Sequence, residues 1–114
     1  MVVSIILKDL SNNGEIRYDD INIDDKDNFS YLDDDNNICH ISVYGNGLCI
    51  NNACKDHKLV LHLLKDEGFA KIVTNEGEIK LNAKVVDFHT NNGILVMRYI
   101  IEDVEREIKL IYRS

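Results

Sequence analysis

Two cysteines and two histidines stand close together in the middle of the chain and have the residue types of a zinc site. Zinc needs four such donors around one ion. If residues 55–56 form a hairpin turn, Cys54 lies opposite His57, and Cys49 lies opposite His62. The odd step of five residues between the two pairs then puts them on opposite faces of the sheet, about 16 Å apart. We therefore expect no metal and no other cofactor, with buried cysteines and partly exposed histidines.

The aspartates and asparagines of residues 33–37 resemble the start of a calcium-binding loop, with oxygen donors at its first, third and fifth positions. However, Ile38 stands where that loop requires glycine, and Tyr44 stands where it requires a glutamate. A polar turn between strands and a weak surface cation site both remain open, and the turn is favoured.

Nucleophile and base pairs are scarce. Cys39 and His40 are adjacent, but neighbours on a strand point to opposite faces. The sequence contains no glycine-rich phosphate loop, no Gly-x-Ser-x-Gly elbow and no His-Glu-x-x-His motif. We therefore expect that the protein is not an enzyme and has no catalytic residues.

Arg98 interrupts the apolar segment 94–101. If its side chain faces an interior, it needs a carboxylate partner or an anionic ligand, which makes it the candidate ligand-binding residue. The favoured interpretation places Arg98 on an outer face, with its stem on apolar surface and its guanidinium in water.

The elements that would position these residues belong to one domain, residues 1–114. The chain has 114 residues, of which 45% are hydrophobic and 29% are charged, and a net charge of −7. Residues 1–37 hold ten acidic and three basic side chains, so the excess negative charge lies there. We interpret it as a solvated acidic face, with a surface for a cation or basic partner as the alternative, and expect no nucleic-acid partner.

No apolar run approaches the ~20 residues that span a bilayer, and no signal peptide is recognisable. The three cysteines are an odd number, which suits free thiols in a reducing compartment. We expect a cytoplasmic protein without membrane contact, either a monomer or a homodimer.

Alternation of apolar and polar residues dominates the chain, and turns rich in asparagine and glycine separate the alternating runs. Shifts in the alternation predict bulges near Val85 and at residues 19–20. The expected strands are 2–9, 15–23, 28–33, 37–44, 47–52, 57–64, 69–74, 77–89, 94–101 and 104–113.

Residues 57–65 and 101–111 also have helical spacing, but strands are favoured because residues 102–103 form a two-residue turn and residue 57 lacks a helix cap. The prediction is an all-β fold: a single antiparallel meander β-barrel of about eight to ten strands. A two-sheet sandwich is the competing architecture.

Six segments match a known family in order and spacing: 47–50, 57–61, 74–78, 92–94, 98–99 and 107–110. Through them the chain resembles the YwiB-like family of small bacterial proteins, which is similar to the calycins, the lipocalin-like β-barrels. The resemblance covers roughly residues 45–113 and implies a calycin-like barrel without an assigned activity. It implies that four residues determine the fold: Thr74, Gly77, Gly93 and Tyr99. Thr74 would form hydrogen bonds with the turn backbone, the two glycines would adopt positive φ, and Tyr99 would fill core volume.

Two functions remain open. In the first, the barrel binds a small, mainly apolar ligand. In the second, its own side chains fill the barrel, and the protein is a non-catalytic interaction or assembly domain. The internal volume decides between them: a closed pocket of several hundred Å³ favours ligand binding, and a solid interior excludes it.

Overall fold

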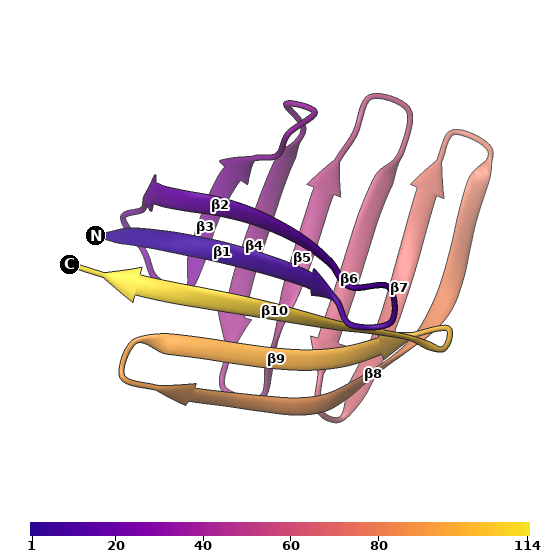
Figure 1. The fold of residues 1–114 in the computed structure, drawn as a ribbon. Helices are drawn as coiled ribbons and strands as arrows, with labels where there is room; N and C mark the ends of the chain where they lie inside the picture. Colours follow the sequence, from indigo (N-terminus) through magenta and orange to yellow (C-terminus); the bar gives the residue numbers. More distant parts are fainter.

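Ten antiparallel strands form nearly the whole chain in the computed structural model, which describes residues 1–114 (Figure 1). Every predicted strand is present, with ends within two residues of the prediction, so the all-β meander is confirmed. The strands are β1 (Val2–Asp9), β2 (Gly14–Asn22), β3 (Asn28–Leu32), β4 (Ile38–Tyr44), β5 (Gly47–Ala53), β6 (Lys58–Leu64), β7 (Glu67–Thr74), β8 (Gly77–Asn91), β9 (Ile94–Ile101) and β10 (Val104–Arg113).

The strands make one sheet in the order β2-β1-β10-β9-β8-β7-β6-β5-β4-β3. Because β1 pairs with β10, the first and last strands of the chain lie side by side, and the sheet curls into a nearly closed barrel (Figure 1). β2 and β3 are its two edges, and no ladder of hydrogen bonds joins them. We call this gap the seam. Across it, the rings of Tyr18 and Tyr31 touch, with centroids 5.2 Å apart.

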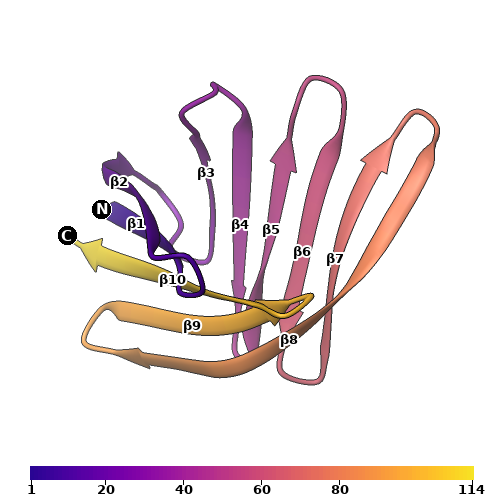
Figure 2. The same cartoon turned by 45° about the vertical axis from the view of Figure 1, so that its right-hand side comes forward.

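The sandwich and helix alternatives are wrong. The fifteen-residue β8 pairs first with β7 and then with β9, and so carries one continuous sheet around a corner (Figure 2). Residues 57–65 and 101–111 belong to strands, and Glu102 and Asp103 form the turn before β10 with φ of 49° and 68°. No helix in the structure has the length and hydropathy needed to cross a lipid bilayer.

Both predicted bulges are confirmed. The register of β8 against β9 shifts between Val85 and Asp87, which leaves one extra residue on β8. The register of β1 against β2 shifts where Ser4 faces residues 19–20, and Asp20 has a φ of 55°. The backbone N–H of Asp20 donates to Ser4 Oγ at 3.3 Å, and its carboxylate pairs with Arg113. These contacts hold the bulge on an edge strand.

The inward face of each strand supplies the core, a cluster of 17 buried residues. The side chains of Ile41, Leu48, Leu63, Met97 and Leu110 are all 0% exposed. They belong to five different strands, and the alternation of each strand turns one of these large apolar side chains into the interior. We call these five residues the filled section.

Candidate functional site

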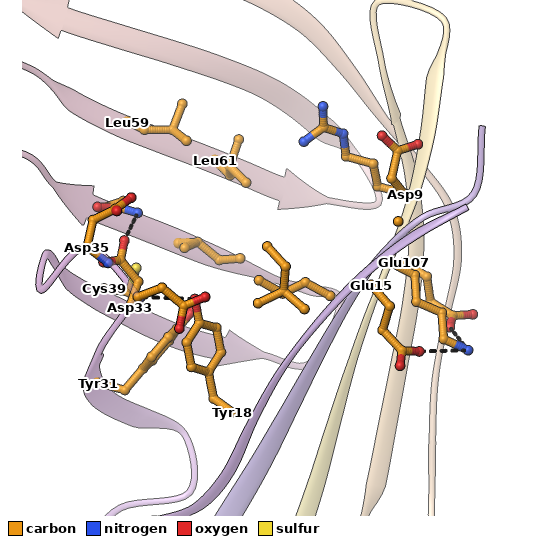
Figure 3. Close-up of a pocket in the computed structure, with 18 of the residues that line it drawn as sticks. Asp9, Glu15, Tyr18, Tyr31, Asp33, Asp35, Cys39, Leu59, Leu61 and Glu107 are labelled. Carbon is orange, nitrogen blue, oxygen red and sulfur yellow. Dashed lines mark hydrogen bonds and ion pairs between the residues drawn. The ribbon is translucent and has the colours of Figure 1, made fainter. Parts of the chain in front are cut away.

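A pocket of about 450 Å³ opens at the end of the barrel where β1 ends and β6 begins (Figure 3). We call it the mouth. Its lining comes from strands at both sides of the seam as well as from the turn between β3 and β4. The lining residues are Leu7, Lys8, Asp9, Gly14, Glu15, Ile16, Tyr18, Tyr31, Asp33, Asp34, Asp35, Cys39, Ile50, Asn52, Leu59, Leu61, Tyr99, Arg106 and Glu107.

The floor of the mouth is apolar and continues into the core. Tyr31, Cys39, Ile50, Leu61 and Tyr99 line the pocket, and each is at most 9% exposed. Four of them face inward because they share the parity of the filled section on their strands, and Tyr31 shares the parity of the buried Phe29 on β3. An organic molecule in the mouth therefore replaces water over an apolar surface, which favours its binding.

Tyr99 is the most deeply placed polar group of this floor. Its residue is 5% exposed, and its hydroxyl has no hydrogen-bond partner in the protein. Burial raises the pKa of Tyr99, while the positive charge of Arg106 acts in the opposite direction. The hydroxyl is therefore neutral at physiological pH and free to donate or accept a hydrogen bond.

Two further tyrosines form the wall at the seam. The rings of Tyr18 and Tyr31 are tilted by 50° to each other (Figure 3). The hydroxyl of Tyr18 accepts the backbone N–H of Asp34 at 3.4 Å, which ties β2 to the turn after β3. Burial raises the pKa of both phenols. A neutral aromatic surface thus faces the opening from both edges of the sheet.

The rim of the mouth is acidic. Its lining includes six acidic residues, Asp9, Glu15, Asp33, Asp34, Asp35 and Glu107, and two basic residues, Lys8 and Arg106. Of these, Lys8, Glu15 and Glu107 have the parity of the outer face on their strands. Lys8 Nζ lies 3.9 Å from carboxylate oxygens of both Glu15 and Glu107 (Figure 3). The rim therefore keeps a clear excess of negative charge at neutral pH.

Two of these carboxylates accept hydrogen bonds from nearby backbone N–H groups. Asp9 accepts the N–H groups of residues 11 and 12 at 3.1 and 3.0 Å, and a hydrogen bond from the Asn12 side chain lowers its pKa. Asp33 accepts the N–H groups of Asp35 and Asn37, both at 2.9 Å, and the Asn37 N–H chiefly lowers its pKa. Residues 33–37 are thus a polar turn, the interpretation that the sequence favoured.

Asp34 and Asp35 differ from Asp33, although all three line the mouth. Only their backbone N–H groups take part in hydrogen bonds, and neither carboxylate has a hydrogen bond or an ion pair. Both residues are exposed. Their two negative charges remain available to a molecule at the opening.

Arg98, the candidate ligand-binding residue, lies elsewhere. On β9, Leu95, Met97 and Tyr99 face inward, and Arg98 faces outward with 43% of its side chain exposed. Its guanidinium donates to Glu105 at 2.6 Å, and this contact raises its pKa. Arg98 therefore lies on the outer face, as the favoured interpretation expected, but its guanidinium contacts Glu105 instead of lying free in water, and it does not line the mouth.

The four residues carried over from the family resemblance have separate positions. Gly77 and Gly93 have φ of 138° and 79° in hairpin turns. Thr74 Oγ1 donates to the Gly77 carbonyl and accepts the N–H of residue 76, both at 3.2 Å. Only Tyr99 reaches the mouth.

The structure separates the two Cys/His pairs that suggested zinc. Cys49 pairs with His62 across β5 and β6, and Sγ lies 3.3 Å from Nδ1 on the outer face of the sheet. The ring of His62 stacks on Phe69 at 4.8 Å. Cys54 instead donates to Asn52 Oδ1 at 3.3 Å. No three histidine, cysteine or acidic side chains come close enough together to share an ion.

Cys39 and His40 point to opposite faces, as the alternation of β4 requires. Cys39 is 3% exposed and lines the mouth, and burial raises the pKa of its thiol. His40 lies on the outer face, with its ring nitrogens 2.7 Å from Ser30 Oγ and 2.6 Å from Asn28 Oδ1. The two side chains do not form a nucleophile and base pair.

A second hollow of about 450 Å³ lies at the other end of the barrel, beside the turn between β8 and β9. It is lined by eleven residues, among them Lys26, Asp27, Val43 and Tyr112. The Tyr112 hydroxyl donates to the Lys26 carbonyl at 2.9 Å, so its main polar group is already paired. Lys26 and Asp27 carry opposite charges, and the N-terminal residue Met1 also lines this hollow.

Comparison with known proteins adds a structural likeness. No family model and no curated protein matches the chain. Among solved structures, it is similar to the ywiB protein from Bacillus subtilis, with a TM-score of 0.42 and 14% sequence identity over 98% of this chain and 89% of that one. A likeness this weak assigns no activity or ligand to the chain.

Proposed function

We propose that the protein is a binding module that holds a small organic molecule with a mainly apolar body in the mouth, as a lipocalin-like barrel does. The observation that carries the proposal is the pocket of about 450 Å³ with a buried apolar floor. Ligand pockets of proteins usually measure roughly 300 to 1,000 Å³ and combine an apolar lining with a few polar groups. Here the polar groups are the Tyr99 hydroxyl and the carboxylates of the rim.

The pocket is open at the end of the barrel and is not the closed pocket expected for binding. The filled section supports the alternative of a filled barrel for the interior behind the pocket. The filled section leaves no exposed apolar surface, whereas Leu7 and Leu59 are only half-buried at the mouth. We also propose a non-catalytic role in the cytoplasm, as a monomer or homodimer without nucleic-acid or membrane partners. Three free cysteines and the net charge of −7 support this part of the proposal.

Binding of Nile red, a neutral fluorescent probe, tests the proposal. We expect saturable binding with a blue-shifted emission, because the dye leaves water for the apolar floor. The Leu59→Trp variant places a larger side chain in the mouth and should weaken binding about tenfold, since roughly 1.4 kcal/mol of contact is lost. Thermal melting monitors whether the variant is folded.

Val60→Trp is the matched control. Val60 follows Leu59 on β6 but faces outward, so the same bulky substitution there should leave Nile red binding unchanged. Equal loss in both variants, or no saturable binding by the wild-type protein, would contradict a ligand site in the mouth.

A further inference from the structure

The charge of the rim, the unpaired hydroxyl on the floor and the aromatic wall together restrict the ligand of the mouth. We infer that the mouth selects an organic cation: an ammonium group attached to an apolar body. This inference rests on the proposed function and specifies the class of molecule that the same site takes.

Charge gives the first argument. Six acidic and two basic residues are among the lining of the mouth, and Asp9, Asp33, Asp34 and Asp35 outnumber Arg106 once the outward Lys8, Glu15 and Glu107 are set aside. Asp9 and Asp33 are held by backbone N–H groups, and Lys8 lies beside Glu15 and Glu107, so Asp34 and Asp35 are the carboxylates without a partner. Charges of one sign around a concave opening attract ions of the other sign and repel anions.

The Tyr99 hydroxyl gives a second, independent argument. It belongs to a residue that is more than nine-tenths buried, lines the pocket and lacks a hydrogen-bond partner. Solvent in the mouth still reaches this hydroxyl, so a ligand that displaces the water must supply a hydrogen-bond partner in its place. An ammonium N–H donates to the lone pair of a phenol, whereas an apolar ligand leaves the hydroxyl unpaired.

The aromatic wall gives the third argument. Tyr18 and Tyr31 come from opposite edges of the seam and meet at 5.2 Å. The faces of tyrosine rings attract cations, above all organic ammonium ions. A bare metal ion gains little from rings and from an apolar floor, because hard cations need several oxygen ligands. A cation with an apolar body satisfies the rim, the wall and the floor together.

The test compares three ligands that share one apolar body: 4-phenylbutylamine, 4-phenylbutanol and 4-phenylbutyrate, each titrated into the whole protein by calorimetry. We expect the amine to bind on the order of tenfold more tightly than the alcohol, the gain typical of one charge-assisted contact. The carboxylate should bind most weakly, because the rim repels it.

The Asp34→Asn/Asp35→Asn variant removes the two unpaired charges and retains the turn, which Asp33 holds. It should abolish most of the preference for the amine and leave the affinity for the alcohol unchanged. The control, Asp24→Asn/Asp66→Asn, removes the same net charge from two exposed positions outside the mouth. This control should keep the full preference for the amine.

Each other outcome has a defined meaning. Equal affinities for the amine and the alcohol would overturn the cation preference and leave the proposed binding function intact. Equal loss in both double variants would overturn the role of Asp34 and Asp35. Binding of none of the three ligands, together with no saturable Nile red binding, would overturn both proposals.

Discussion

The filled section and the mouth use the same strands and the same alternation, but they differ in what faces inward at each level. On β6, Leu63 is 0% exposed in the filled section, and Leu59 is half-buried at the mouth. On β5, Leu48 lies in the filled section, while the next inward positions toward the mouth are Ile50 and then Asn52. One barrel can thus be solid at one level and hollow at another.

The difference follows from the cost of burying charge. Asp9, Asp33 and Arg106 occupy inward positions at the level of the rim, and a charged side chain cannot enter an apolar core without losing its hydration. The barrel therefore cannot close over itself there. Stability comes from the filled section, and the mouth remains free for binding.

Truncation of one leucine in the filled section and one at the mouth should give the largest difference in stability. Leu63→Ala should lower the free energy of unfolding by about 3 kcal/mol, because it leaves a cavity in a fully packed region. Leu59→Ala, the same change at the mouth of the same strand, should cost less than about 1 kcal/mol, because water can enter the space. Urea denaturation measures both values. Equal losses would show that the mouth is packed like the filled section.

Alkaline pH tests the buried tyrosines, of which Tyr31 and Tyr99 line the mouth and Tyr112 lies at the other end of the barrel. Burial raises the pKa of Tyr99 and Tyr31, and raises that of Tyr112 to about 12. The native protein therefore holds these protons more tightly than the unfolded chain, in which tyrosines ionise near pH 10. Their contribution to stability is complete below pH 10 and is lost as the pH rises toward the folded-state pKa values.

We expect the free energy of unfolding to fall by about 2 kcal/mol between pH 8 and pH 10.5, as measured by urea denaturation. Tyr99→Phe should remove part of this fall, since phenylalanine has no proton to lose. An unchanged pH dependence in that variant would mean that water already surrounds the Tyr99 hydroxyl.

Arg98→Met should have the smallest effect. Arg98 lies on the outer face, and its contact with Glu105 is a half-buried ion pair away from the mouth. We expect Nile red affinity to change by less than about twofold, because the substitution leaves the mouth as it is. A larger loss of binding would show that the outer face, and not the mouth, holds the dye.

The sequence predicts the strands well because local alternation and hairpin turns determine them. The two bulges follow from the same pattern: the parity shifts at Val85 and at residues 19–20 correspond to register shifts in the sheet. Local pattern also identifies Glu102 and Asp103 as a turn, where both residues take positive φ.

The mouth is harder to predict because it depends on strands that do not pair. Tyr18 and Tyr31 meet only because the curled sheet brings its two edges together, and no local signal encodes that contact. The sequence gives a partial signal, because Tyr18 lies two residues after Ile16 and Tyr31 two residues after Phe29, so each tyrosine shares a strand face with an apolar residue. The sequence also leaves Arg98 ambiguous, because apolar residues occupy both faces of β9.

An amide chemical-shift map by two-dimensional NMR shows directly whether the ligand binds in the mouth. On titration with 4-phenylbutylamine, we expect saturable shifts at Tyr18, Tyr31 and Leu61 in the mouth, and none at Leu48 and Leu110 in the filled section. Shifts centred on the outer face around Arg98, or no saturable shifts at any residue, would contradict a ligand site at the open end of the barrel.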